Sequence, residues 1–294
     1  MQDFEYVAPT TLEEAVRLLD GNGLKVKALA GGTDILVQLR ANRFQVDRLV
    51  DIKGIPELNQ LSCSEADGLT LGAAVPCYRV YEDERIARLY PALVDATSLI
   101  GSIQVQSRGT VGGNLCNAAP SGDSIPALII LGATCEIAGP KGRRTVQVER
   151  FCTGPGRNVL EPGEMLVSLK LPLPKANSGA HFLRFTPRKE MDIAVVGVGA
   201  SVLLDDARQR ILSARIALGA VAPTPLLARE AGDLLAGREA SEAAIEEAAK
   251  AARAAARPIT DIRGTARQRT HLVGVLTKRA LGTAIARAKE GKKP

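Results

Sequence analysis

Ala30-Gly31-Gly32-Thr33-Asp34 and Thr110-Val111-Gly112-Gly113-Asn114 are the two stretches of this 294-residue chain that say most about its architecture. A bound phosphate needs several backbone N–H groups directed at one point, and glycines permit this through positive φ and close approach. The first stretch follows a short apolar segment, residues 25–30, and precedes a second one, residues 35–40. We therefore expect a strand, a glycine turn and a helix start capped by Thr33 or Asp34.

Either glycine turn alone is weak evidence for a ligand, because Gly-Gly pairs are common in ordinary turns. Neither stretch has the three spaced glycines of the dinucleotide fingerprint or the Gly-Lys-Ser/Thr ending of the phosphate loop. The nucleotide-binding folds that those motifs mark are therefore not indicated.

The composition is that of a folded globular protein, with 46% hydrophobic and 24% charged residues. The net charge is +6, but the segment from Arg263 to Pro294 holds nine Lys or Arg and one acid, which leaves −2 for the rest. This basic segment is either a docking surface or a solvated helix face. Aromatic residues make up only 3% and there is no Trp, so a nucleic-acid partner is not expected.

The pattern of apolar and reactive residues narrows the class further. No uncharged run approaches the roughly 20 apolar residues of a membrane span, and acids near Met1 replace the basic end of a secretory signal, so we expect a cytoplasmic protein. The five cysteines are dispersed and the two histidines are far apart in sequence. This spacing predicts reduced thiols, no metal site and no hydrolase triad.

Periodicity predicts a mixed α and β chain. A capping box at Thr11 opens a helix over residues 12–19, and Gly139-Pro140-Lys141-Gly142 joins a hairpin over residues 134–148. Further helices are expected at 35–40, 85–98 and 124–131, and Pro91 lies near the middle of the second or marks a restart. Strands are expected at 46–52, 69–75, 166–173, 193–204 and 211–221. Alanine-rich helices follow to the end, and Pro174 with Ser178-Gly179 indicates a boundary near residue 177.

Five stretches, taken together, resemble a known family. In chain order they are Phe4-Glu5-Tyr6-Val7-Ala8-Pro9, Leu29–Leu36, Gly101–Asp123, Gly163–Pro172 and Arg184–Ala194. They are similar to the FAD-binding medium subunit of the molybdenum hydroxylases, of the xanthine dehydrogenase and carbon monoxide dehydrogenase type. The resemblance covers nearly the whole chain.

The resemblance implies an α+β fold. A two-part FAD-binding domain of the PCMH/vanillyl-alcohol-oxidase type would span residues 1–177, with subdomains at about 1–55 and 56–177. A smaller domain of a sheet and helices would span residues 178–290.

The resemblance also implies a site for FAD, with no catalytic and no metal residue on this chain. Residues 29–35 would wrap the diphosphate and adenosine end, Thr110, Gly113 and Asn114 would complete the cradle, and Asp123 would meet ribityl or ribose hydroxyls. The full implied set is Leu29, Ala30, Gly31, Gly32, Thr33, Asp34, Ile35, Ile100, Gly101, Thr110, Val111, Gly112, Gly113, Asn114, Asp123, Leu166 and Arg184.

Several of these residues have an alternative explanation. Asp123 also suits a helix N-cap, and Ile100, Gly101 and Leu166 suit ordinary core packing. Arg184 stands where the family often has lysine, although the two cations are not interchangeable. Outside the implied set, Gln106 stands where many relatives have arginine, which predicts a weaker anchor, and Cys116 is interpreted as a small buried hydrophobe.

The function implied is electron transfer. FAD would pass electrons from [2Fe–2S] clusters on a small partner subunit to an external acceptor, and a large subunit would hold molybdopterin, in a dimer of heterotrimers. The loop 186–192 would lie beside the flavin, where Arg188 and Lys189 would attract an anionic acceptor or simply be solvated. Two alternatives are a free-standing flavin oxidase or reductase and a non-catalytic subunit with a decayed site.

Overall fold

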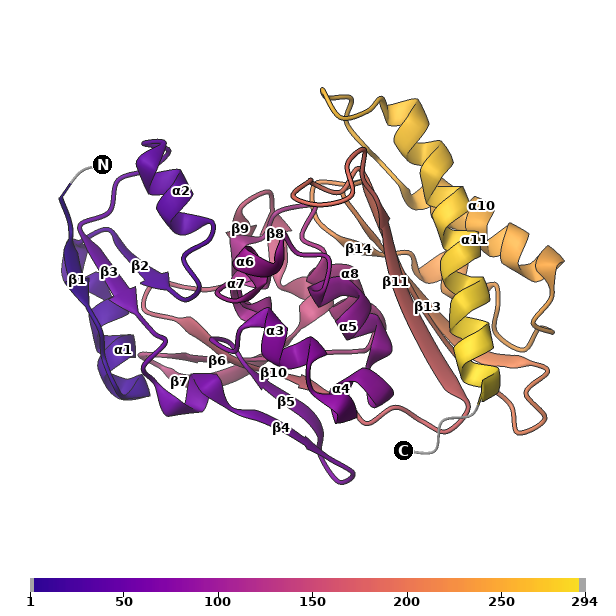
Figure 1. The fold of residues 1–294 in the computed structure, drawn as a ribbon, viewed down its shortest axis with the longest axis horizontal. Helices are drawn as coiled ribbons and strands as arrows, with labels where there is room; N and C mark the ends of the chain where they lie inside the picture. The colour runs from indigo at the N-terminus through magenta and orange to yellow at the C-terminus, as the bar shows by residue number, and fades with distance from the viewer. Residues whose placement is uncertain (1–2, 291–294) are drawn as a thin grey trace.

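The computed structural model describes residues 3–290, and Figure 1 shows three sheets that follow one another along the long axis in chain order. The first sheet is parallel, with order β1-β3-β2, and its strands are β1 (Glu5–Val7), β2 (Val26–Leu29) and β3 (Arg48–Asp51). The chain crosses between these strands through α1 (Leu12–Leu19), the 3₁₀ turn Gly21–Gly23 and α2 (Ile35–Arg40). The Thr11 hydroxyl accepts the Glu14 N–H at 3.3 Å, so the predicted cap of α1 is confirmed.

The second sheet is antiparallel, with strand order β4-β5-β10-β6-β7. Its strands are β4 (Leu61–Ser64), β5 (Gly68–Gly72), β6 (Thr134–Gly139), β7 (Gly142–Gln147) and β10 (Met165–Leu171). The 3₁₀ turns Pro56–Asn59 and Val148–Arg150 flank it, and β8 (Cys152–Gly154) pairs with β9 (Arg157–Asn158). The predicted hairpin and the strand at 166–173 are confirmed, and β10 is the buried centre of the sheet.

Six helices connect β5 to β6. They are α3 (Cys77–Tyr81), α4 (Glu84–Leu89), α5 (Pro91–Thr97), α6 (Ile103–Gln106), α7 (Val111–Asn117) and α8 (Ser124–Ile130). Of the two alternatives for residues 85–98, the restart at Pro91 is the one observed: there are two helices, because Pro91 has no N–H to donate and disfavours helical backbone at Tyr90. Proline instead opens α5, where a missing donor costs nothing.

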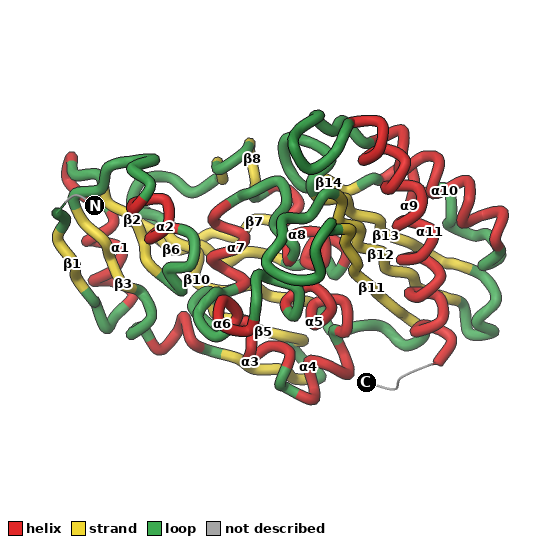
Figure 2. Tube along the Cα trace, turned by 45° about the horizontal axis from the view of Figure 1, so that its top comes forward, coloured by secondary structure: helices red, strands yellow, loops and turns green. Residues whose placement is uncertain are grey.

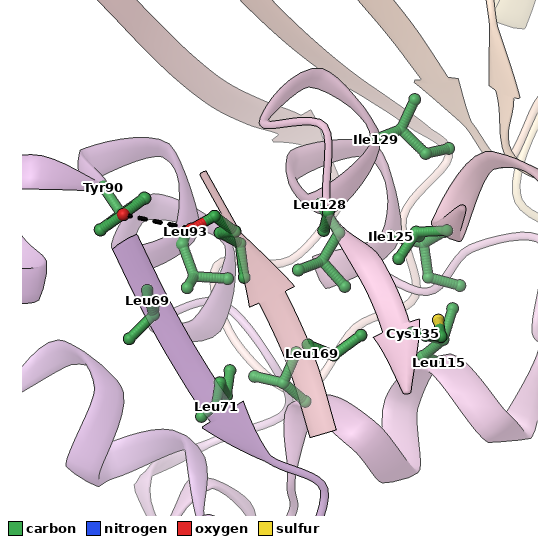
Figure 3. Close-up of a cluster of buried hydrophobic side chains, with 14 of the residues drawn as sticks. Leu69, Leu71, Tyr90, Leu93, Leu115, Ile125, Leu128, Ile129, Cys135 and Leu169 are labelled. Carbon is green, nitrogen blue, oxygen red and sulfur yellow. Dashed lines mark hydrogen bonds between the residues drawn. The ribbon is translucent and has the colours of Figure 1, made fainter. Parts of the chain in front are cut away.

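The main hydrophobic core lies between these helices and the second sheet. Figure 3 shows Leu93 of α5 and Leu128 of α8 close to Leu69 and Leu169 of the strands, and all four side chains are fully buried. Burying a leucine side chain stabilises the fold by about 2 kcal/mol. This packing fixes the position of α8, whose start carries Asp123.

The third sheet and the last helices form the C-terminal part. The strand order is β11-β12-β13-β14, with β11 (Ser178–Phe185), β12 (Val196–Leu204), β13 (Ile211–Gly219) and β14 (Leu226–Leu227). The helices are α9 (Arg229–Asp233), α10 (Glu242–Ala255) and α11 (Ala266–Glu290). Figures 1 and 2 show α11 running along the sheet. The two long predicted strands are confirmed, starting at Val196 and Ile211.

Sequence periodicity does not predict β11. Its start, Ser178-Gly179, looks like a loop, yet Gly179 is required by packing, because a Cβ there would lie 2.1 Å from the Ala284 carbonyl oxygen. Small residues on α11, including Ala280 and Ala284, let this helix approach the strand closely. The glycine that indicates a boundary in the sequence is therefore a helix–strand contact in the fold.

An ion cluster joins α5 to the C-terminal sheet and helix. Asp95 accepts two hydrogen bonds from the Arg287 guanidinium, at 2.6 and 3.0 Å, and its Oδ2 lies 2.6 Å from His181 Nδ1. Arg287 also donates to the Ala180 carbonyl oxygen at 2.7 Å. One basic residue of the C-terminal segment is thus committed to an internal contact, and residues 291–294 of that segment lie outside the described residues.

Asp95→Asn is expected to lower the free energy of unfolding by about 2 kcal/mol, because it leaves the Arg287 guanidinium without its counter-charge. Burial would raise the pKa of Asp95, but hydrogen bonds from His181 and Arg287 outweigh burial and hold this pKa below its ordinary value. The stabilisation is therefore complete above about pH 4, the unfolded pKa, and is lost as the pH falls through the folded pKa. Urea unfolding of both proteins across that range measures it; equal stability at about pH 7 contradicts the cluster's role.

Candidate functional site

The first glycine segment turns the chain from β2 into α2. Gly32 has φ +79°, which favours glycine, and Gly31 allows a close backbone approach, since a Cβ there would lie 2.1 Å from the Arg108 carbonyl oxygen. Asp34 occupies the N-cap position of α2, but its side chain makes no capping hydrogen bond. The predicted strand, turn and helix are confirmed, whereas a side-chain cap from Asp34 is not formed.

The second glycine segment is a helix start, so the expected glycine turn is wrong there. Thr110 is the N-cap of α7, and its hydroxyl accepts the Gly113 N–H at 2.8 Å. A Cβ on Gly112 would lie 2.6 Å from the Ala73 carbonyl oxygen, so this glycine serves packing. A Cβ on Gly113 would meet only the Thr110 hydroxyl, at 3.0 Å, and otherwise faces open space.

The fold brings the two segments together. Gly31 packs against Arg108 and Gly109, the two residues just before Thr110. The Gln38 side-chain amide of α2 donates to Asn117 Oδ1 of α7 at 3.3 Å, across 79 residues of sequence. The two segments, 79 residues apart in sequence at Gln38 and Asn117, are thus neighbours in the fold.

Asp123 and Arg184 form a buried ion pair at the edge of this site. Asp123 stands in the N-cap position of α8 without capping it, and its Oδ2 accepts a hydrogen bond from Arg184 Nη1 at 2.5 Å. The side chains are only 9% and 4% exposed. The other carboxylate oxygen, Oδ1, is buried and has no hydrogen-bond partner among residues 3–290. Burial raises the pKa of Asp123 to about 7, although Arg184 opposes the rise.

The remaining implied residues divide into loop and core positions. Gly101 has φ +59° and its carbonyl accepts the Met191 N–H at 3.3 Å, so the loop 186–192 reaches the loop before α6. Asn114 Oδ1 accepts the Ser124 hydroxyl at 2.7 Å and so ties α7 to α8. The other implied residues are half-buried at Ala30, Thr33, Ile35 and Ile100 and buried at Leu29, Val111 and Leu166.

Two known domain families match consecutive parts of the chain. Residues 2–174 match the FAD binding domain in molybdopterin dehydrogenase, and residues 181–284 match the CO dehydrogenase flavoprotein C-terminal domain. The chain belongs to the molybdenum hydroxylase family, as an FAD-binding medium subunit. The resemblance and the α+β fold expected from the sequence are therefore confirmed, and the chain is an oxidoreductase flavoprotein subunit.

Full-length relatives agree with this assignment. The xanthine dehydrogenase FAD-binding subunit of Escherichia coli O157:H7 is 34% identical, over 98% of each chain. The carbon monoxide dehydrogenase medium chain of Afipia carboxidovorans is 33% identical, over 97% of this chain and 98% of that one. The structure of carbon monoxide dehydrogenase from Hydrogenophaga pseudoflava superposes with a TM-score of 0.93, at 34% identity over 97% and 98% of the two chains.

The site of this FAD-binding subunit fits its cofactor in two respects. Glycines keep side chains away from the meeting point of the two segments, which leaves backbone to face a diphosphate. The unpartnered Asp123 Oδ1 is a buried acceptor, and buried polar atoms are nearly always paired in the complete protein. A hydroxyl of the cofactor would supply the missing donor.

Some contacts of the implied residues were not predicted from the sequence. Gly31 packs against Arg108 and Gly109, and the glycine beside Thr110 was the signal that could have indicated this. The Gln106 amide donates to the carbonyls of Ser98 and Ile100, at 2.9 and 3.1 Å. Gln106 thus fixes the loop that carries Ile100.

The cysteines of the subunit are free thiols that are buried or half-buried. All five cysteines are free, and burial raises the pKa of Cys116 to about 12, so this thiol stays protonated at neutral pH. Within residues 3–290, no three His, Cys, Asp or Glu side chains gather as a metal site would need. None of the helices in that range is long and apolar enough to cross a membrane.

Proposed function

We propose that this subunit passes electrons from [2Fe–2S] clusters on a partner subunit, through its FAD, to an external acceptor. FAD can accept electrons singly and give them up in pairs, which joins a one-electron chain to a two-electron acceptor. The observation that carries the proposal is the meeting of two glycine segments beside a buried carboxylate oxygen without a partner. The protein's own contribution is to hold and orient the cofactor and to exclude water from it.

The proposed residue roles are those that the family resemblance implies. We assign the diphosphate and adenosine end of FAD to residues 29–35, and the rest of the cradle to Thr110, Gly113 and Asn114. Asp123 accepts a ribityl or ribose hydroxyl, since a carboxylate oxygen accepts such donors well. Ile100, Gly101 and Leu166 lie toward the flavin ring, Ile100 and Gly101 on a loop and Leu166 from the core behind it.

The partners are a small iron–sulfur subunit and a large molybdopterin subunit, arranged as a dimer of heterotrimers. The names of the relatives, a medium chain and an FAD-binding subunit, support a place in such a complex. We further propose domain boundaries at 1–177 and 178–290, with a subdivision near residue 55, which the change of sheet between β10 and β11 supports. The free thiols support a cytoplasmic location.

Access of the acceptor is controlled by the loop 186–192. Two hydrogen bonds hold the loop in place. The Asp192 carboxylate accepts the Arg188 N–H at 3.0 Å, and the Met191 N–H donates to the Gly101 carbonyl. The Arg188 side chain is 73% exposed, 3.5 Å from Asp192. Arg188 is thus able to meet an anionic acceptor at the surface.

The isolated subunit is expected to carry one non-covalent FAD and no stoichiometric iron. Among residues 3–290 no three His, Cys, Asp or Glu side chains gather as a metal site would need, and the core buries Cys77 and Cys135, so four thiolates cannot converge on a cluster without unfolding that core. Flavin absorbance after gel filtration, with iron and acid-labile sulfide assays, measures both numbers. Iron and acid-labile sulfide in amounts equal to that of the chain would contradict the proposal that the clusters are on a partner subunit. A subunit without flavin would contradict the proposed FAD site.

A further inference from the structure

Asp123 and Arg184 reach each other from the two domains of the subunit. Asp123 stands at the start of α8 in the FAD-binding domain, and Arg184 lies on β11 of the C-terminal domain, 61 residues later. Nearly complete burial of both side chains makes this a charge-assisted hydrogen bond shielded from water. The C-terminal domain therefore contributes a side chain to the wall of the proposed FAD site.

The C-terminal domain also holds the backbone next to Asp123. The Ala220 N–H donates to the Pro120 carbonyl oxygen at 2.7 Å, just before α8. A Cβ on Gly199 of β12 would lie 3.0 Å from the Pro126 carbonyl oxygen, so the strand packs directly on the first turn of α8. The C-terminal domain thus holds both the backbone next to Asp123 and its carboxylate.

Fixing one oxygen of a carboxylate fixes the other. The hydrogen bond from Arg184 to Oδ2 sets the plane of the Asp123 carboxylate and so the direction of Oδ1, the oxygen left without a partner. We propose that Arg184 is a positioning residue for FAD: it acts on the cofactor through Asp123, by directing Oδ1 at a cofactor hydroxyl. This inference rests on the FAD site of the proposed function.

Electrostatics give the pair a second effect. Burial favours the neutral form of Asp123, and Arg184 is the charged group, among residues 3–290, that opposes this and lowers the pKa. Without Arg184 the pKa of Asp123 would rise further, and the carboxyl would be protonated at neutral pH. A protonated carboxyl is a weaker acceptor for a hydroxyl, so FAD affinity depends on the charge of Arg184.

A double-mutant cycle on the full-length chain tests the proposal, with FAD itself titrated into apoprotein. Arg184→Met and Asp123→Asn are each expected to raise the dissociation constant about 30-fold, the value of one charged hydrogen bond. The double variant is expected to match Asp123→Asn alone, because Arg184 acts through that side chain. Arg184→Lys keeps one charged donor and should recover most of the affinity.

The pH profile separates positioning from a merely structural role. In the wild type the dissociation constant should rise as the pH falls below about 7, by at most about tenfold per unit, since one carboxylate takes up a proton. In Arg184→Met the rise should begin at a higher pH, and in Asp123→Asn it should be absent. Arg238→Met is the matched control, because it breaks an exposed Arg–Glu pair of the same domain and should change affinity less than about twofold.

The outcomes distinguish this inference from the proposed function. A wild-type chain that binds no FAD overturns both. If the wild type binds FAD tightly and the double variant raises the dissociation constant by the product of the two single effects, only the inference is overturned. Arg184 would then act independently of Asp123. If the FAD affinity of Arg184→Met changes with pH at the same midpoint as that of the wild type, the inference alone is likewise overturned.

Discussion

Gly113→Val is expected to release FAD from the subunit, with a dissociation constant at least about a hundredfold above the wild-type value. The Cβ position of Gly113 faces open space except for the Thr110 hydroxyl, and the proposed cofactor fills that space. Three added carbons would have to displace a bound group or the Thr110 cap, and overpacking of this kind costs about 3 kcal/mol. Fluorescence titration of the apoprotein with FAD measures the change.

Gly282→Val is the matched control for this substitution. Gly282 also lies within a helix, α11, and a Cβ there would meet nothing within 4 Å. Both substitutions change helix propensity by well under about 1 kcal/mol, so both chains should fold, but only Gly113→Val should lose flavin. Full flavin absorbance in Gly113→Val after gel filtration would show that the cradle is misassigned.

Gly32→Val is expected to lose FAD as well, but there the loss would combine a direct effect on the cofactor with strain in the loop itself. Its positive φ strains any β-branched residue, and a Cβ would lie 3.1 Å from the Leu36 side chain. The loop would rearrange even without cofactor. Gly113 is therefore the sharper position at which to test the site.

Local sequence signals predicted the elements on which the site stands. The cap at Thr11, the turn at residues 139–142 and the two long strands predicted at 193–204 and 211–221 all depend on neighbouring residues, so they can be predicted without the fold. The two glycine segments are also local signals. That the two segments belong to one FAD site was implied only by the resemblance of five stretches, in their chain order, to a known family.

Contacts between distant segments could not be predicted in the same way. Gly112 looks like a turn glycine, but it lies in helix α7, and a side chain there would clash with Ala73. The second residue of β11, Gly179, is a glycine because α11, about a hundred residues later, packs against it. The pairing of Asp123 with Arg184 depends on how two domains dock, and neither residue carries a local sign of it.

Reconstitution of the complex tests the central claim, that this subunit relays electrons and does not oxidise a substrate by itself. The measurement follows flavin absorbance under anaerobic conditions, with the organic substrate that the co-purified native complex oxidises. The isolated subunit should be reduced by dithionite and not by that substrate, and adding the iron–sulfur and molybdopterin subunits should make its FAD reducible by the substrate. Oxidation of the substrate by the purified single chain, at a rate comparable to that of the complex, would contradict the account.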